Sequence, residues 1–373
     1  MQKPVAENEF SDHPNSRAVQ KGAWKWVILS IVILTGYVLA RNYVYLKGGL
    51  LKPNFGLIHQ AYDFNLWELP MTLLCLAIAL SVLSLTWAAM RKVLILISLV
   101  YGFVAIDLFI LRYYVTYIEP QRIVVHQVRL ETQKLTEPVR LLHISDIQSG
   151  GIGDYEKHLF DRIKELKPDL ILNTGDLLQV VPPATFESEF PKLLELIKTV
   201  NPRLGTYAVF GDTERELYDM SPDEIMPLQM LSSRSLKIDT KAGVLHIYGL
   251  SLYQSKKQAW ALRAVEEWLK MTQSSDFCIL FGHAPDYAME MMDQPIDLCL
   301  AGHTHGGQVR LPWYGPLVIY SKVPREWARG FRRIGVPFLN VSAGAGSNRF
   351  EGFPPMRFNC PTEMTLIELV PLD

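Results

Sequence analysis

A chain of 373 residues is long enough for one large domain or two modest ones, and 37 basic residues against 38 acidic ones leave it nearly neutral. This balance argues against nucleic acid as a partner, because nucleic-acid binding relies on clustered positive charge. The four cysteines form no Cys-x-x-Cys pair, so neither a disulfide framework nor a zinc ribbon is expected. Composition says nothing about the oligomeric state.

The first third of the chain carries most of the apolar excess. Residues 1–21 are polar and lack apolar periodicity, which predicts a disordered tail. We expect a transmembrane region over residues 22–117, with helices at about 24–41, 69–90 and 93–112. A run of this kind can cross about 30 Å of hydrocarbon at about 1.5 Å per residue. Arg91 and Lys92 alone separate the last two, which predicts a helical hairpin, and residues 42–67 are expected to form a loop.

The orientation in the membrane is only weakly indicated. Three spans place the two ends of the chain on opposite sides of the bilayer. One side of the bilayer would carry six basic residues, namely Lys3, Arg17, Lys21, Lys25, Arg91 and Lys92. The other side would carry five, namely Arg41, Lys47, Lys52, Arg112 and Arg122. This slight excess favours a cytoplasmic N-terminus and an extracytoplasmic C-terminal domain. Asp107, within the third run, would by default be a functional candidate, but it is interpreted as a residue near the helix end, within reach of Arg112 or an interfacial group.

Residues 118–373 have the pattern of a globular α/β domain, with short apolar runs between amphipathic stretches. Candidate strands are residues 123–130, 139–145, 169–173, 206–210, 244–252, 277–281, 296–301, 338–342 and 364–369. Candidate helices are residues 155–166, 187–200, 225–231 and 257–271. Most of these strands are apolar throughout, which is typical of a sheet buried on both faces.

Five of the strands end in side chains that could bind metal. They deliver, in chain order, Asp146 and Gln148, Asp176, Asp212, His283, and the pair His303 and His305. Taken singly, a helix-capping aspartate or a packed histidine is the better explanation of each. The carboxyl ends of strands in an open α/β sheet share one edge, however, and imidazole and carboxylate are ligands for divalent metals. Together the five strand ends predict a two-metal site.

The last of these motifs, Gly302 to Gln308, reads Gly-His-Thr-His-Gly-Gly-Gln and resembles the calcineurin-like metallophosphoesterase superfamily, in particular its bacterial membrane-associated branch. The resemblance covers about residues 121–373, including the closing segment 357–363. It implies a four-layered αββα sandwich and a dinuclear metal centre. By this resemblance, one metal is held by Asp146, Gln148, Asp176 and His305, and the other by Asp176, Asp212, His283 and His303. Asp176 would bridge the two ions.

Three positions depart from the pattern of the superfamily. Gln148 stands where most relatives carry histidine, and its amide oxygen, a harder ligand, shifts the expected metal towards manganese, with iron, zinc or magnesium as alternatives. Asp212 replaces an asparagine and adds a negative charge. Thr213 replaces a histidine that steadies the phosphate in relatives. Arg215 is the candidate for that role, although a solvated loop arginine explains it more simply. The residues expected to act in catalysis are thus Asp176, Thr213 and Arg215.

These features together predict a membrane-anchored, dinuclear metal-dependent phosphohydrolase. In such an enzyme, metal-activated water attacks a phosphoester or pyrophosphate bond. A lipid or envelope-precursor headgroup is the expected substrate, and a multi-pass position in the bacterial inner membrane is the expected location. One alternative is a metal-binding membrane protein with weakened catalysis. Another, implied by the resemblance, is a UDP-diacylglucosamine-type pyrophosphohydrolase of lipid A synthesis, which needs a cytoplasmic active site.

Two further segments invite a functional reading. Gln308 could orient a ligand histidine. Residues 322–333 interleave lysine and arginine with Trp327 and Phe331. This segment is either a solvated loop or a rim that meets anionic lipid headgroups.

Overall fold

The structure is a computed structural model that describes residues 14–51, 55–349 and 354–372. It separates into two compact units, Met1–Tyr113 and Tyr114–Asp373. The division falls close to residue 118, where the sequence pattern changes from long apolar runs to short ones. Each unit is described by itself.

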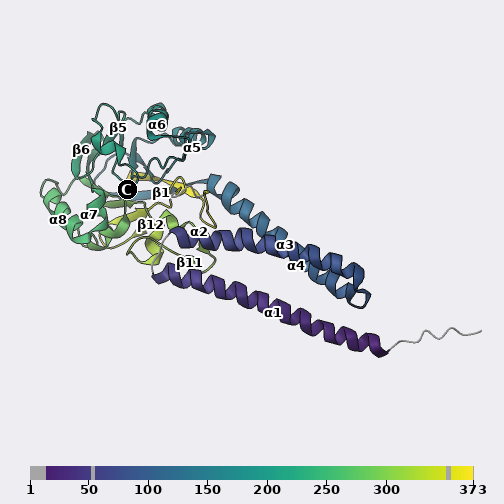
Figure 1. Ribbon diagram of the computed structural model, residues 1–373. Helices are drawn as coiled ribbons and strands as arrows, with labels where there is room; N and C mark the ends of the chain where they lie inside the picture. Colours follow the sequence, from purple (N-terminus) through teal and green to yellow (C-terminus); the bar gives the residue numbers. More distant parts are fainter. Residues whose placement is uncertain (1–13, 52–54, 350–353, 373) are drawn as a thin grey trace, which may run out of the picture. The chain divides into compact units, whose positions relative to one another are not determined.

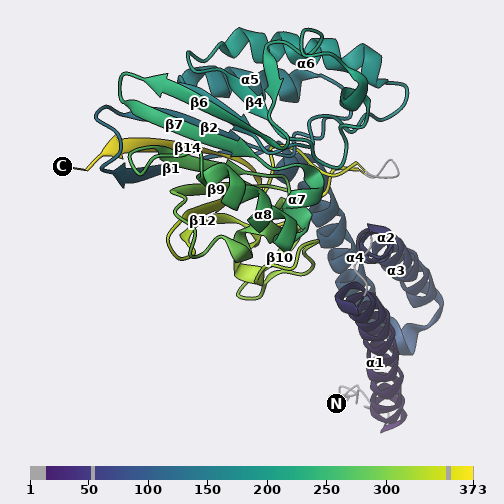
Figure 2. The same cartoon turned by 90° about the vertical axis from the view of Figure 1, so that its left-hand side faces the viewer.

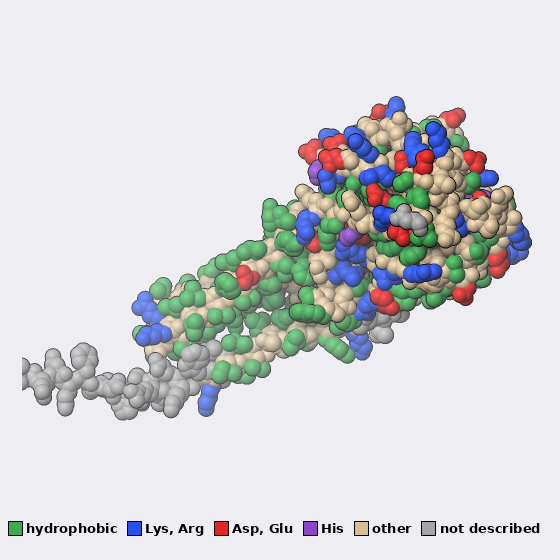
Figure 3. Space-filling view, turned by 180° about the vertical axis from the view of Figure 1, so that it is seen from behind, with side chains coloured by type: hydrophobic (Ala, Val, Ile, Leu, Met, Phe, Trp, Pro, Cys, Tyr) green, Lys and Arg blue, Asp and Glu red, His purple; other side chains and the backbone are tan. Residues whose placement is uncertain are grey.

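The first unit is helical (Figure 1). Its helices are α1 (Pro14–Leu51), α2 (Phe55–Asp63), α3 (Leu69–Thr86) and α4 (Arg91–Tyr113), with a π-helical turn at Phe64–Glu68 and a 3-10 turn at Ala88–Met90. Three stretches are long and apolar enough to cross a membrane, namely Ile28–Gly48, Gly56–Thr86 and Ala88–Gln121. Large apolar side chains such as Leu85, Leu99 and Phe103 face outwards on these helices, and Figure 3 shows how densely such side chains cover the unit. Such a surface suits lipid better than water.

Two expectations for this unit were wrong. Residues 14–21 belong to α1 instead of a disordered tail, while residues 1–13 lie outside the described part of the chain. Residues 42–67 are largely helical instead of a loop, because the apolar residues 43–46 continue α1 and the π-helical turn joins α2 directly to α3. Residues 52–54 are not described. Arg112 pairs with Asp63 at 3.8 Å.

The expected hairpin is formed by α3 and α4. Leu73 and Ala77 pack against Val93, Ile97 and Tyr101 in a small core between the two helices. The hydroxyl of Ser98 donates to the carbonyl of Ala77 at 2.7 Å. Small and hydroxylated residues at such a contact allow two helices to approach closely.

The second unit contains two six-stranded sheets (Figure 2). The first has the order β1 (Ile123–Thr132), β14 (Thr362–Pro371), β2 (Val139–Ile144), β3 (Leu170–Asn173), β4 (Thr206–Ala208), β5 (Leu228–Met230). The second has the order β12 (Gly330–Arg333), β13 (Phe338–Val341), β9 (Leu298–Ala301), β8 (Phe277–Phe281), β7 (Gly243–Gly249), β6 (Arg234–Thr240). A short ribbon of β10 (Arg310–Leu311) and β11 (Gly315–Pro316) stands apart from both sheets.

Helices cover the outer faces of both sheets. Helices α5 (Asp154–Leu166) and α6 (Phe186–Val200) lie on the first sheet, and α7 (Leu252–Lys256) and α8 (Gln258–Leu269) on the second (Figure 2). Short helical turns occupy Tyr114–Ile118, Glu119–Gln121, Glu216–Asp219, Pro285–Glu290, His305–Gly307 and Arg325–Ala328. The expected four-layered αββα sandwich is therefore the observed architecture.

The strand sequences explain these layers. In β8, Phe277, Ile279 and Phe281 enter the core between the two sheets, whereas Cys278 and Leu280 enter the core beneath α8. Alternate side chains of one strand thus face two separate apolar cores, which is why the strand is apolar at every position.

The prediction of a helix over residues 225–231 was wrong. They contain β5, whose Leu228 pairs with Thr206 of β4 in a parallel ladder. Pro227 cannot supply the backbone N–H that a helix interior requires. The strand is short and adds the outermost ladder of the first sheet, so tertiary pairing decided its conformation and local periodicity did not.

Candidate metal centre

The strand ends that carry the predicted ligands meet at one edge of the sandwich. Backbone hydrogen bonds fasten them to one another. The N–H of Asp146 donates to the carbonyl of Gly175 at 2.9 Å, and the N–H of Gln148 donates to that of Asp176 at 2.9 Å. In the second sheet the N–H of Gly302 donates to the carbonyl of His283 at 2.8 Å. The ladder of each sheet thus continues into the turns that bear the candidate ligands.

Five candidate ligands have a left-handed backbone conformation. Their φ angles are 49° at Asp146, 40° at Gln148, 59° at Asp176, 66° at His303 and 49° at His305. Residues other than glycine adopt this region rarely and at a cost, and such residues cluster at functional sites. Here the conformation turns the side chains away from the alternation of the strands, so that neighbouring ligands can approach one point.

The first cluster of side chains consists of Asp212, His283 and His303, with ligand atoms all within 4.8 Å of one another. Asp212 Oδ2 lies 3.1 Å from His303 Nδ1 and 3.5 Å from His283 Nε2. The other ring nitrogen of His283, Nδ1, lies 2.7 Å from the carbonyl oxygen of Thr174, which can only accept. This hydrogen bond fixes the ring and leaves Nε2 facing the cluster, as is usual for metal-binding histidines.

The second cluster consists of Asp146, Asp176 and His305, again within 4.8 Å of one another. Asp146 Oδ2 accepts hydrogen bonds from the hydroxyl of Ser145 and from the N–H of His303, the latter at 3.0 Å. Its other oxygen, Oδ1, faces His305 Nε2 at 3.4 Å. Asp146 thus has one oxygen held by the protein and one directed into the cluster.

Buried atoms without a hydrogen-bond partner test whether this site fits metal ions. Within the described ranges they include Asp146 Oδ1, Gln148 Oε1 and His305 Nδ1. Two of the three are oxygens that can only accept, and burying an acceptor without a partner costs about 1–3 kcal/mol. A divalent cation would satisfy such oxygens, so the donor set fits divalent metal ions.

The charges of the site act on one another strongly. Complete burial lowers the pKa of His283, but Asp176, Asp212 and Asp146 outweigh burial and raise this pKa to about 10. Burial raises the pKa of Asp146 to about 6, against the pull of His283. Without metal the histidine therefore carries the positive charge that the carboxylates require. Metal binding would replace its proton.

Asp212 and His305 have their pKa values shifted below the usual range. Partial burial raises the pKa of Asp212, but hydrogen bonds from His283 and His303 prevail and hold it well below its ordinary value. Burial lowers the pKa of His305 far below that of a free imidazole. His305 is thus neutral, which is the state in which an imidazole binds metal.

Glu214, the last residue of the third motif, holds two of the turns at the centre together. Its carboxylate accepts the N–H of Gly211 at 2.6 Å and the N–H of Leu177, and it is buried. Burial, followed by the charge of Asp176, raises its pKa to about 8. This side chain ties the turn of the second motif to that of the third. The sequence alone does not reveal this role, because one of the two partners, the N–H of Leu177, belongs to another strand end.

Replacing Glu214 with glutamine should weaken manganese binding by about 10- to 100-fold, the usual effect of losing a group that positions ligands. One arm of the amide would present N–H groups to the backbone N–H of either Leu177 or Gly211, so one turn would lose its acceptor. Isothermal titration of metal-stripped protein with manganese measures the change. An affinity equal to that of the wild type would show that Glu214 does not position the ligands.

The remaining predicted site residues lie at different distances from the clusters. The N–H of Thr213 donates to Asp176 Oδ1 at 3.1 Å, while its hydroxyl lies 3.4 Å from Glu214. Arg215 is exposed and forms no ion pair or side-chain hydrogen bond with any described residue. The structure thus brings Thr213 to the site through its backbone and leaves Arg215 in solvent.

Two neighbouring residues have structural roles. Gln308 accepts the N–H of Asn348 at 3.3 Å and donates to the carbonyl of Met356 at 3.0 Å, so it closes a loop and does not orient a ligand histidine. His143 is packed between Asn340 and Thr174, and burial lowers its pKa to about 3.

Lys256 is a charged residue at the site that the sequence reading did not find. Its Nζ lies 2.6 Å from Asp212 Oδ1. It ends α7, the helix that follows the carboxyl end of β7. The one available signal was the start of this helix, where Ser251 and Gln254 form a capping box directly after a strand.

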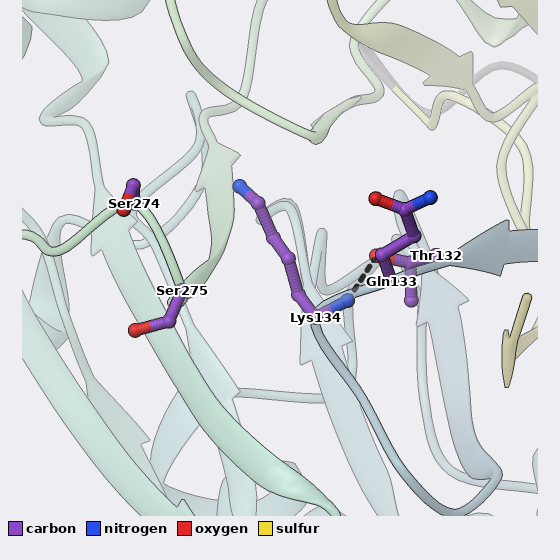
Figure 4. A pocket seen from close by; sticks show the side chains of 5 residues that line it. All are labelled: Thr132, Gln133, Lys134, Ser274 and Ser275. Atoms are coloured by element: carbon purple, nitrogen blue, oxygen red, sulfur yellow. Dashed lines mark hydrogen bonds between the residues drawn. The ribbon is translucent and has the colours of Figure 1, made fainter.

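One surface pocket is not part of this centre. It is lined by Thr132, Gln133, Lys134, Ser274 and Ser275 (Figure 4). Thr132 ends β1 of the first sheet, and Ser275 shortly precedes β8 of the second, so the pocket lies at the edge of the sandwich opposite the candidate ligands. Lys134 is already paired with Asp297 at 2.8 Å.

The sequence of this chain is similar to those of known proteins. Residues 139–307 match the family model described as calcineurin-like phosphoesterase. The chain is 26% identical over 271 residues to the uncharacterized metallophosphoesterase YkuE of Bacillus subtilis, covering 69% of this chain and 88% of that protein. It is 28% identical over 215 residues to the phosphodiesterase YaeI of Escherichia coli, covering 55% and 72%. The solved phosphoesterase Yfce of E. coli is 13% identical, with a TM-score of 0.28 over 58% of this chain and 85% of that one.

Proposed function

We infer that this chain, whose globular unit belongs to the calcineurin-like phosphoesterase superfamily, hydrolyses a phosphoester or pyrophosphate bond with two divalent metal ions. The motifs predicted this family and this enzyme class, a hydrolase acting on ester bonds. The family model and the phosphodiesterase relative confirm both. The observation that carries the proposal is the pair of adjoining ligand clusters, in which buried oxygens of Asp146 and Gln148 have no hydrogen-bond partner among the described residues.

Each ligand has a role in this proposal. The cluster of Asp146, Asp176 and His305, with Gln148 beside it, would hold one ion, and the cluster of Asp212, His283 and His303 would hold the other together with Asp176. Such a pair of ions lowers the pKa of a bound water and neutralises phosphate oxygens during in-line attack. The protein holds the ligands in place through Ser145, Thr174 and Glu214. Asp176 lies between the two clusters, and His283 Nε2 is 3.6 Å from its Oδ2.

Manganese is the ion we propose, with magnesium, iron or zinc as alternatives. Gln148 offers an amide oxygen where most relatives place an imidazole, and its Nε2 donates to Asp176 Oδ2 at 2.6 Å. This hydrogen bond assigns the nitrogen to Asp176 and leaves Oε1 as the free atom. An oxygen-rich set favours manganese or magnesium over softer ions.

We propose a bacterial inner-membrane lipid, or an envelope precursor with a lipid anchor, as the substrate. The support is the helical unit, in which three stretches have the length and composition of membrane spans. A tethered active site meets substrates near the bilayer more often than soluble ones. An extracytoplasmic position of the globular unit follows from the slight charge bias alone. A UDP-diacylglucosamine-type substrate would instead require the cytoplasmic side.

The basic segment 322–333 gives this lipid proposal little support. Trp327 packs against the core beneath α8, and Phe331 packs against the core between the sheets. Arg329 pairs with Glu363 at 2.7 Å. Neither aromatic ring is free to anchor at a membrane interface.

The test uses the full chain in detergent, stripped of metal and then supplied with manganese. Bis-p-nitrophenyl phosphate and p-nitrophenyl phosphate report diesterase and monoesterase activity. Manganese-dependent turnover that is absent from the metal-stripped protein is the expected result. Bound manganese without turnover on either ester, or on lipid phosphates, would favour the alternative of a metal-binding membrane protein. Turnover of soluble nucleotides but of no lipid phosphate would overturn the lipid proposal alone.

A further inference from the structure

Lys256 stands at the solvent side of the first ligand cluster. Its ammonium lies 2.6 Å from Asp212 Oδ1, and the other oxygen of Asp212 lies 3.1 Å from His303 Nδ1. The side chains of Lys256 and Asp212 are 35% and 40% exposed, whereas the side chain of His283 is fully buried. A substrate phosphate that approaches this cluster from solvent therefore meets Lys256.

The position of Lys256 is fixed by packing. The neighbouring Ser255 is buried, donates its hydroxyl hydrogen to the carbonyl of Leu252 at 2.8 Å and accepts the N–H of Ala284 at 3.2 Å. Ala284 directly follows His283. Helix α7 is thus fastened to the turn that carries a candidate ligand, so the base of the Lys256 side chain keeps its place relative to the cluster.

The net charge of the metal site indicates a role for Lys256 beyond that of a surface ion pair. An exposed pair of this kind contributes little to stability by itself. Two divalent ions with Asp146, Asp176 and Asp212 retain one positive charge, whereas an asparagine in place of Asp212 would leave two. Lys256 restores the second positive charge beside the residue that removes it. Its three donors also suit a phosphate oxygen.

The other residues near the third motif are less suited to this task. The Thr213 hydroxyl lies 3.4 Å from the Glu214 carboxylate, so it faces the supporting side of the turn. Arg215 has no ion pair or side-chain hydrogen bond among the described residues that would hold it towards the centre. Of these three side chains, only that of Lys256 is held against a candidate metal ligand among the described residues.

We propose that Lys256 binds a phosphate oxygen of the substrate and so takes over the steadying role of the histidine that Thr213 replaces. This inference rests on the proposed function, because it places the phosphate at the metal clusters. Asp212 holds the ammonium at the rim of the site until substrate arrives. Lys256 then donates a hydrogen bond to the phosphate while its charge offsets that of Asp212.

The test compares Lys256→Met, Lys256→Arg and the matched control Lys257→Met in the manganese-loaded full chain. Lys257 is the exposed next residue, so its replacement removes the same charge beside the site. Titration calorimetry with inorganic phosphate should show affinity about tenfold or more weaker in Lys256→Met, the loss expected for one charge-assisted hydrogen bond. Lys256→Arg should retain most of the affinity, and Lys257→Met should match the wild type. Manganese affinity should not fall in any of them.

Several results would overturn the inference. They are unchanged phosphate affinity in Lys256→Met, a parallel loss of manganese affinity, or no phosphate binding by the manganese-loaded wild type. The double variant Asp212→Asn with Lys256→Met separates contact from bulk charge, since full recovery of phosphate affinity in it would mean that Lys256 acts through charge alone. Binding of phosphate does not depend on turnover. A wild-type protein that bound phosphate without hydrolysing esters would refute the proposed function while still measuring the contribution of Lys256.

Discussion

Replacing Asp176 with asparagine should reduce manganese-dependent hydrolysis on the order of 10³-fold, a loss expected when a ligand shared by both ions is removed. Both carboxylate oxygens are already committed to donors. Oδ1 accepts the N–H of Asp212 at 2.5 Å and that of Thr213 at 3.1 Å, and Oδ2 accepts from Gln148. In either orientation of its amide, an asparagine would direct its NH₂ group towards one of these donors. The side chain would therefore lose its negative charge and also its position as a ligand.

The control for this prediction is Asp297→Asn. Asp297 also accepts a backbone N–H, that of Cys278 at 2.7 Å, but it lies at the opposite end of the strands and pairs with Lys134. Its replacement should leave turnover close to the wild-type value. Initial rates on bis-p-nitrophenyl phosphate, with thermal unfolding to confirm a folded protein, measure both variants. An Asp176→Asn protein that is folded and retains more than about a tenth of the activity would contradict its assignment as a shared ligand.

Replacing Gly302 with alanine should abolish measurable manganese binding at the second cluster. A methyl group at this position would overlap the hydroxyl of Ser145 and Oδ2 of Asp146. These are the atoms that hold Asp146 in place, and the adjacent His303 donates its N–H to the same oxygen. The backbone cannot yield easily, because the N–H of Gly302 is bonded to the carbonyl of His283. The added carbon therefore displaces a ligand or separates two turns.

Gly153→Ala is the matched control, because a methyl group there meets only Glu156 Oε2 at 3.7 Å, an ordinary contact. Manganese titration of the metal-stripped proteins should show two ions per chain in the wild type and in Gly153→Ala, and fewer in Gly302→Ala. Thermal unfolding curves of the metal-stripped variants distinguish a protein that has lost the metal site from one that has lost its fold. Full occupancy in Gly302→Ala would mean that Asp146 is not needed for binding.

The candidate ligands could be predicted from sequence because each follows an apolar strand directly. Asp146, Asp176, Asp212 and His283 stand one or a few residues past a strand end, and parallel strands bring such ends to a common edge. Lys256 was missed for the opposite reason. It sits at the far end of a short helix, and only the packing of Ser255 against Ala284 returns it to the site. No pattern in the local sequence expresses that contact.

The errors in the fold have similar causes. Residues 42–67 contain proline, asparagine and glycine, which suggested a loop, yet a π-helical turn carries α2 into α3 without a break. Residues 225–231 have helical spacing, but Pro227 and pairing with β4 favour a strand. In each case a tertiary or neighbouring element outweighed local propensity, whereas the buried strands of both sheets were fixed by their own composition.

Strand β14 imposes an order on folding. It lies between β1 and β2, parallel to the first and antiparallel to the second. Ala345, which follows β13, also supports the centre, since its N–H donates to the carbonyl of Ser145. The first sheet therefore stays open while the ribosome makes the rest of the chain, and β1 and β2 have unpaired edges until residues 362–371 emerge. Pairings so distant in sequence form slowly and leave partly built sheets prone to aggregation. We therefore expect the site to gain metal affinity only after β14 has paired with β1 and β2.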